Sequence, residues 1–184
     1  QNPISQVDAE SIQADETYQI DTLILATGFD AITGALTGLD IVGRNEINLK
    51  DQWKEGAKSY LGLGVSNFPN LFTITVPGSP SVLSNLMPSI EQHVNWIANC
   101  IGWMSENNKS VIESTETAEE EWMKLVNEIA DTTIFTSTKS WYNGSNIEGK
   151  AKSFLPFIGV PVYTEKLEEI TAADYQGFVF DKSN

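Results

Sequence analysis

Residues 71–85 read LFTITVPGSPSVLSN, and this stretch decides the fold class. It begins with an apolar and β-branched run at 71–76, which is typical of a strand buried on both faces. A loop rich in Pro, Gly and Ser follows at 77–81 and leads into a long helical pattern. This order of strand, loop and helix, repeated with mixed elements along the chain, predicts an α/β fold.

The helical pattern after this loop is long and has a clear apolar side. We expect the helix to start near residues 85–87, with Asn85 or Ser84 as its N-cap. Pro88 then falls in the first turn, where a helix tolerates proline. The apolar side is expected to face a core, because its members recur at spacings of three and four: Ile90, Val94, Ile97, Ile101 and Met104.

The flanking sequence predicts further elements on both sides. Residues 20–27 form a second apolar run, expected to be a central parallel strand, and it stops at Gly28. Thr117 and Glu120 have the spacing of a capping box and predict a helix over 117–130. The remaining expected elements are short exposed strands within 1–19, a strand at 39–42, a helical turn at 49–53, an acidic helix over 164–174 and a strand at 177–180.

Composition excludes several classes of protein. The chain has 184 residues, a length that fits one domain or a substantial piece of a larger one. Its net charge is −14. Nucleic-acid binding is not expected, because phosphates require basic residues and Arg44 is the single arginine. The longest apolar stretch, 94–104, is too short to cross a bilayer. Gln1 is not an initiator Met and no secretory signal follows, so we expect a processed, trimmed or partial chain.

Few residues offer independent catalytic chemistry. Cys100 is the single cysteine, which excludes a disulfide framework and favours a cytoplasmic location. His93 and Cys100 are too few to form a metal site, and His93 is expected to be a satisfied helical histidine rather than a catalytic base. The acidic run 119–121 is expected to be a solvated helix start. The sequence 62–67 begins like a dinucleotide-binding loop but lacks the third glycine and a following helix, so it is discounted.

Two turns are more specific candidates for ligand binding. The first, 26–30, follows a predicted central strand, and open α/β sheets bind ligands at the carboxyl ends of such strands. The second, 77–86, combines small residues with a helix start, which favours negative charge. Taken singly, an ordinary strand-ending turn explains the first better, and a plain connector is a fair explanation of the second.

Taken together, these segments resemble flavin-dependent monooxygenases. Residues 21–30 (DTLILATGFD) resemble the ATG segment that follows the inserted NADPH domain in that family. Further segments occur in the order found in Baeyer–Villiger monooxygenases, and the group closest in character is that of phenylacetone and cyclohexanone monooxygenases. These segments are 60–62 (YLG), 68–72 (FPNLF), 77–85 (PGSPSVLSN), 89–94 (SIEQHV), 140–147 (SWYNGSNI) and 149–150 (GK).

The resemblance covers almost the whole chain and implies a two-dinucleotide-binding-domain flavoprotein. In such enzymes NADPH reduces a tightly held FAD, which then uses O2 to convert a small-molecule ketone into an ester or lactone. The protein must shield the reacting flavin from water. The chain would supply the returning half of the FAD domain, residues 1–110, and a helical substrate-side region, residues 111–184, which covers the active site.

We assign a role known from the family to a residue of this chain only where that residue lies in a segment that matches a family motif. The turn near the cofactor would involve Ala26, Thr27, Gly28 and Asp30. The segment along the flavin would involve Ser84, Asn85 and Leu86, with Leu86 where relatives of phenylacetone monooxygenase carry Met. Substrate contacts are expected from Ser81, Val82 and Leu83. Trp141 matches a tryptophan in a mobile stretch that contacts NADP, whereas a buried packing role is its alternative.

The family pattern is incomplete in this chain. Both Gly-x-Gly-x-x-Gly loops are missing, as are the family fingerprint and the arginine that assists the chemistry, a role that Arg44 does not inherit. We therefore expect about the last third of such an enzyme, dependent on amino-terminal FAD and NADPH regions and inactive alone, with no catalytic residue of its own. Two alternatives remain: another class B flavin monooxygenase that oxidises nitrogen or sulfur, which the match over 140–150 disfavours, and a non-catalytic acidic binding module.

Overall fold

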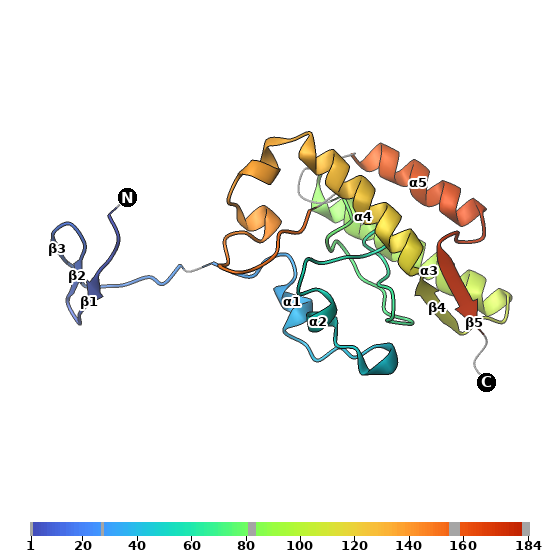
Figure 1. Cartoon of the computed structure of the whole chain (residues 1–184), viewed down its shortest axis with the longest axis horizontal. Coiled ribbons are helices and arrows are strands. Elements are labelled where there is room, and N and C mark those ends of the chain that lie inside the picture. Colours follow the sequence, from blue (N-terminus) through green and yellow to red (C-terminus); the bar gives the residue numbers. More distant parts are fainter. Residues whose placement is uncertain (1, 27, 81–83, 155–158, 182–184) are drawn as a thin grey trace.

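Three helices and a small sheet form the body of the protein in the computed structural model (Figure 1). The structure describes residues 2–26, 28–80, 84–154 and 159–181. Helices α3 (Leu86–Glu106), α4 (Glu116–Asp131) and α5 (Val160–Ala172) lie beside the antiparallel pair β4 (Val111–Ser114) and β5 (Phe178–Asp181). The predicted helices over 117–130 and 164–174 and the predicted last strand are confirmed to within a few residues.

The amino-terminal residues form a separate antiparallel meander. Its strands are β1 (Gln6–Val7), β2 (Ser11–Gln13) and β3 (Thr17–Gln19). Figure 1 shows this sheet standing away from the body, joined to it by an extended segment. The prediction of short exposed strands within residues 1–19 is confirmed.

A smaller lobe built from short helices packs beside the body. It contains α1 (Gly34–Thr37), η1 (Arg44–Glu46) and α2 (Leu49–Gln52), and α2 confirms the predicted helical turn. The expected strand at 39–42 is wrong: Val42 makes only an isolated bridge with Asn48. Leu49, Trp53, Val65 and Phe68 are among the buried residues of this lobe.

The main core is aromatic and draws on every large element of the body. Trp96 of α3 packs against Tyr175 and Phe178, with ring centroids 5.2 and 5.6 Å apart. Trp122 of α4 and Tyr163 of α5 belong to the same cluster. Because residues on both sides of position 110 share this core, the two predicted parts of the chain are packed together.

Helix α3 has two apolar faces, and the sequence pattern identified the outer one. The face buried by this chain consists of Ser89, His93, Trp96, Cys100 and Met104. Of the predicted core stripe only Met104 is buried, while Val94 and Ile101 are 46% and 52% exposed. The expectation that this stripe faces a core within the chain is therefore wrong for Val94 and Ile101, whereas Met104 lies in the main core and Ile97 packs against it.

Neither apolar run folds as the predicted strand. Residues 20–26 have no strand pairing, and Ile24 and Leu25 are exposed. In 71–76 only Phe72 makes a bridge, with Gly64, and Thr75 has a positive φ of 55° that interrupts an extended chain. A central strand requires neighbours on both edges, and the described part of this chain supplies no paired strand to 20–26 and only the isolated bridge at Phe72 to 71–76.

Both long helices begin with side-chain caps, one of which was predicted correctly. Asn85 caps α3, since its side chain accepts a hydrogen bond from the Met87 N–H, and Pro88 lies in the first turn as expected. Helix α4 is capped by Thr115, which accepts from Ala118 N at 3.2 Å. The predicted capping box at Thr117 and Glu120 is therefore wrong, because the helix starts two residues earlier.

Replacing the true cap should destabilise the protein, and replacing the predicted one should not. Thr115→Ala removes the acceptor for Ala118 N–H, so we expect the free energy of unfolding to fall by about 1 kcal/mol. Thr117→Ala is the matched control, because this exposed residue lies inside the helix. Denaturant unfolding of both variants checks the assignment, and an equal loss in the two would contradict it.

Candidate functional site

The loop before α3 is a buried, tightly bonded connector. Residues 76–80 are all buried, and three successive carbonyl oxygens accept hydrogen bonds from side chains. Ser79 Oγ donates to Val76 O at 2.8 Å, and Ser59 Oγ donates to Pro77 O at 2.5 Å. From α4, Trp122 Nε1 donates to Gly78 O at 2.6 Å. The loop is therefore held from within and from two other parts of the chain.

Gly78 is required where these bonds converge. Its φ is +95°, a left-handed conformation that favours glycine. A Cβ atom at Gly78 would lie 2.5 Å from Ser59 Oγ and 3.3 Å from Trp122 Nε1. Backbone and anchoring side chains therefore approach as closely as their sizes allow.

The predicted flavin-side residues stand at the start of α3. Asn85 is exposed, Leu86 is 39% exposed, and Ser84 is half-buried with its Oγ 3.4 Å from Ser89 Oγ. The first turn contains no charged side chain. The predicted substrate contacts Ser81, Val82 and Leu83 lie outside the described residues.

An ion pair joins the predicted turn at 26–30 to the loop at 140–150. Asp30 accepts a hydrogen bond from Lys150 Nζ, which links residues 26–30 to the 140–150 loop. Ala26 and Gly28 are exposed, and Gly28 has a φ of +83°. Thr27 lies outside the described residues. Two of the quoted motifs, 120 residues apart in sequence, are thus side by side.

Trp141 projects from a loop that is closed on itself. Asn143 is buried, and its amide donates to Phe135 O and Thr138 O at 3.0 and 3.2 Å. Trp141 is 48% exposed, with its ring 4.8 Å from that of Tyr142. The buried packing role weighed as the alternative does not fit this exposure within the chain.

His93 is a buried histidine with both ring nitrogens bonded. Thr75 N–H donates to Nδ1 at 3.2 Å. The Tyr163 hydroxyl donates to Leu61 O at 2.6 Å, so Nε2 of His93 donates to the hydroxyl oxygen at 2.9 Å. Burial lowers the pKa of His93 to about 4 and raises that of Tyr163. His93 is neutral and structural, as the sequence predicted.

Acidic residues at the start of α4 bind a neighbouring loop. Glu119 is buried and accepts from Ser66 N and Ser66 Oγ at 2.8 and 3.0 Å, and burial raises its pKa. The prediction that 119–121 is a solvated run is therefore wrong for Glu119.

The single arginine is also paired with an acidic side chain, since Arg44 Nε donates to Glu113 Oε2 at 2.6 Å. Among the described residues no group of His, Cys, Asp and Glu is arranged to hold a metal ion.

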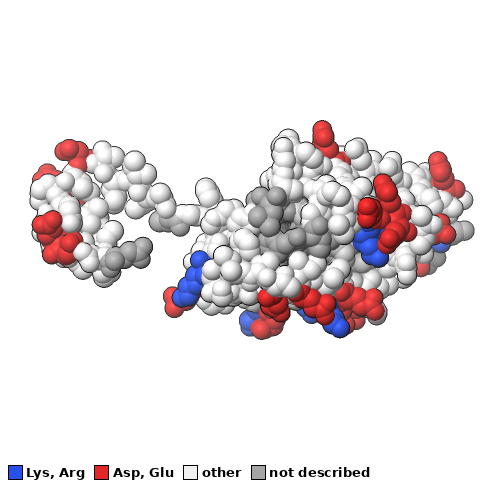
Figure 2. All heavy atoms as spheres, turned by 90° about the horizontal axis from the view of Figure 1, so that it is seen from above, with Lys and Arg blue, Asp and Glu red and all other residues white. Residues whose placement is uncertain are grey.

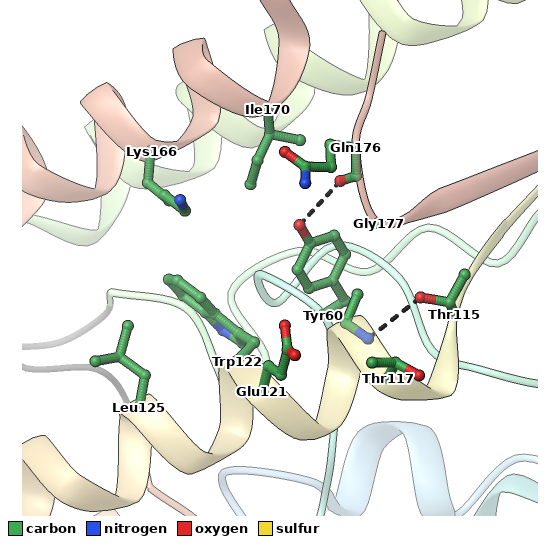
Figure 3. Close-up of a pocket in the computed structure, with 11 residues that line it drawn as sticks. Tyr60, Thr115, Thr117, Glu121, Trp122, Leu125, Lys166, Ile170, Gln176 and Gly177 are labelled. Atoms are coloured by element: carbon green, nitrogen blue, oxygen red, sulfur yellow. Dashed lines mark hydrogen bonds between the residues drawn. The ribbon is translucent and has the colours of Figure 1, made fainter. Parts of the chain in front are cut away.

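A surface pocket of about 360 Å³ lies between α4 and α5 (Figure 3). Tyr60 lies in it and donates from its hydroxyl to Gln176 O at 2.9 Å. Lys166, Glu121 and the indole of Trp122 also line the pocket. Trp122 thus borders this pocket while its Nε1 reaches the loop before α3.

Sequence relatives match nearly the whole chain. An acetone monooxygenase of Gordonia sp. is 40% identical over 181 residues, which span 96% of this chain and 34% of the relative. A cyclohexanone 1,2-monooxygenase of Acinetobacter is 41% identical over 160 residues, covering 86% and 29%. A phenazine N-monooxygenase of Lysobacter antibioticus is 39% identical over 182 residues, covering 97% and 33%. No protein-family model matches.

Solved structures agree with these relatives. A closed crystal structure of cyclohexanone monooxygenase has a TM-score of 0.92 and 38% identity, covering 99% of this chain and 34% of that one. The NADP+-bound enzyme from Rhodococcus has a TM-score of 0.93 and 36% identity over the same shares. In sequence and in backbone, this chain matches Baeyer–Villiger monooxygenases over nearly its whole length. It spans about a third of the curated relatives it matches, and its α/β fold is that of a partial region of a two-domain flavoprotein.

Sequence reasoning found the segments that this chain shares with its relatives but missed the residues that hold them together. Trp122 falls inside the helix predicted over 117–130, but its bond to Gly78 O was not predicted. Ser59 and Lys150 were not singled out as partners of distant loops. The sequence does show a tryptophan in a helix and a glycine-containing turn, but only the structure shows that these two residues, 44 positions apart, are bonded to each other.

No described helix has the length and apolarity needed to cross a membrane.

The buried state of His93 gives the chain a specific pH dependence. The unfolded imidazole has a pKa near 6.5 and takes up a proton that the native one, with a pKa of about 4, does not. Stability is therefore complete above pH 6.5 and falls as pH drops toward 4, at most by ~1.4 kcal/mol per pH unit from this residue.

Denaturant unfolding at pH 7, 6 and 5 measures this effect. His93→Gln should be less stable at pH 7, since it replaces a fitted ring, but should lose less stability between pH 7 and pH 5. Parallel pH profiles for the two proteins would show that His93 does not remain neutral in the native state.

Proposed function

We propose that this chain is the carboxyl-terminal third of an FAD- and NADPH-dependent Baeyer–Villiger monooxygenase. The whole enzyme would insert one oxygen atom next to a ketone carbonyl and yield an ester or lactone. The observation that carries the proposal is the agreement in backbone over 99% of the chain with cyclohexanone monooxygenases, at TM-scores of 0.92 and 0.93. Solved neighbours are described as bound to FAD and NADP.

The start of α3 suits one wall of a flavin site. FAD would supply the redox chemistry, and this chain would supply position and shielding. The helix start is uncharged and partly exposed, its dipole favours negative charge, and Leu86 and Met87 give it an apolar surface. An aromatic ring system with an electron-rich edge fits these features. The phosphate-binding loops would come from the amino-terminal regions, since this chain has none.

The exposed apolar surfaces fit docking onto those amino-terminal regions. Met87, Val94 and Ile101 lie seven residues apart on α3, so they share its outer face, and Ile24 and Leu25 expose a second apolar area. Contiguous exposed apolar surface marks an interaction site. Because the relatives are about three times as long, their remaining chain is the occupant we propose. Figure 2 shows acidic groups on the amino-terminal sheet and along one edge and one end of the body, with a few basic groups among them.

The predicted residue roles are part of this proposal. The turn with Ala26, Thr27, Gly28 and Asp30 would lie near the cofactor, in the returning part assigned to residues 1–110. Substrate contacts would come from 81–83, and Trp141, in the covering part 111–184, would contact NADP. The exposure of the Trp141 ring and the ion pair that joins its loop to Asp30 support this arrangement.

A second candidate is oxygenation of a nitrogen atom in an aromatic heterocycle. It is favoured by the 39% identity to a phenazine N-monooxygenase over 97% of this chain. The same flavin chemistry would serve both reactions, so the geometry of the substrate pocket decides between them. A non-catalytic acidic module is the third candidate, and it predicts no flavin binding at all.

Purified full-length polypeptide containing this chain tests the three candidates together. We expect it to be yellow with bound FAD and to convert members of a panel of cyclic, aromatic and linear ketones into esters or lactones, identified by mass spectrometry. Conversion of phenazine alone would favour the second candidate. A colourless protein that takes up no added FAD would overturn the flavoenzyme assignment.

Trp141 provides a test at single-residue level. In the full-length polypeptide, Trp141→Ala should raise the KM for NADPH about tenfold, equivalent to ~1.4 kcal/mol of binding, or alter ketone selectivity, because an exposed indole is a strong contact residue. Its melting temperature should change little. Trp103→Ala is the control, since Trp103 packs against Tyr175 and Phe180 and should act mainly on stability. Unchanged kinetics with a collapsed melting temperature would assign Trp141 a packing role.

A further inference from the structure

We infer that Trp122 is a positioning residue: its indole N–H fixes the buried loop 76–80, from which the chain enters the segment proposed to face flavin and substrate. This inference rests on the proposed function for its catalytic consequence. Its structural part, the anchoring of the loop by α4, stands on the geometry alone.

The loop depends on side chains because its own backbone offers few donors. Pro77 and Pro80 have no N–H group, so two of the five residues cannot donate a backbone hydrogen bond. Gly78 N donates to Phe154 O and Ser79 N to Val76 O. The carbonyl of Val76 thus has a backbone donor besides Ser79 Oγ, whereas those of Pro77 and Gly78 accept from the Ser59 hydroxyl and the Trp122 indole. A buried carbonyl without a donor costs ~1–3 kcal/mol.

Trp122 is the donor that comes from a long helix. Ser79 lies within the loop, and Ser59 lies in a neighbouring loop and also accepts from Gly62 N at 3.1 Å. Trp122 is 4% exposed, and its helix is fixed at its start by the Thr115 cap and by Glu119. A short bond of 2.6 Å from a rigid helix defines the position of Gly78 O more closely than a bond between two loops.

The position of the Gly78 carbonyl matters because the proposed site residues come next along the chain. Residues 81–83, outside the described part, come directly after the loop, and Ser84 and Asn85 then lead into α3. If these residues face the flavin and the ketone, a displacement at Gly78 is passed on to the reacting groups. Misplacement of reacting groups by about 1 Å is enough to cost orders of magnitude in rate.

Two variants separate anchoring from general core packing. Trp122→Phe keeps an aromatic ring and removes the donor to Gly78 O. Trp96→Phe removes an equally buried indole donor, which bonds Thr171 Oγ1 at 3.0 Å between α3 and α5, away from the loop. Both changes remove one hydrogen bond and the same ring atoms, so they should lower the melting temperature similarly.

Hydrogen exchange in the full-length polypeptide tests the anchoring. In Trp122→Phe the amides of Gly78 and Ser79 should exchange roughly tenfold faster, equivalent to ~1.4 kcal/mol less protection. In Trp96→Phe they should exchange as in the wild type. If Trp122→Phe does not fold, Ser59→Ala removes the neighbouring donor and should give the same local effect. Equal exchange at Gly78 in both tryptophan variants would overturn the inference.

Steady-state turnover tests the catalytic consequence separately. Trp122→Phe should keep FAD and its rate of flavin reduction by NADPH, lose about tenfold in kcat/KM for the ketone, and oxidise more NADPH per product formed. Trp96→Phe should keep the wild-type ratio of product to NADPH. A wild-type ratio in Trp122→Phe would refute the positioning role. If no ketone is converted even by the wild type, the proposed function fails, while the exchange result still decides the anchoring.

Discussion

The arrangement of this protein depends on one helix that must be covered on two sides. Helix α3 buries His93, Trp96 and Cys100 against the rest of the chain, and it presents Val94 and Ile101 outward. A helix that is apolar on both sides is stable only between two layers. The inner layer is formed by α4, α5 and the aromatic core. The outer layer we propose is the further polypeptide that relatives about three times as long contain.

This constraint explains which parts of the fold could be predicted from sequence. Asn85 and Pro88 were placed correctly, because capping and the lack of a proline N–H are local effects. The run 20–27 was predicted as a strand, and its apolar character is genuine. Its secondary structure, however, depends on pairing with other strands, which no property of the run itself provides. Val94 and Ile101 of the stripe on α3 were assigned to the wrong layer for the same reason, because periodicity identifies an apolar face and not its partner.

The same distinction between local patterns and distant contacts applies to the candidate site. Resemblance located the segments at 26–30, 77–86 and 140–150, and the Asp30–Lys150 pair shows two of them in contact. The contacts that hold the loop before α3 were not predictable, because Trp122 and Gly78 are 44 positions apart and neither forms part of a spacing rule. Likewise the burial of Glu119 among exposed acids follows from Ser66, whose N–H and hydroxyl both point to it.

The single arginine, Arg44, limits what this chain could contribute to the chemistry of the proposed enzyme. The one guanidinium in 184 residues is paired through its Nε with Glu113. In a complete enzyme, an arginine that assists the chemistry would have to be contributed from elsewhere. In the enzyme we propose, substitutions confined to this third would therefore change which ketones are accepted and how much NADPH is oxidised per product, while the groups that carry the reaction itself would lie outside it.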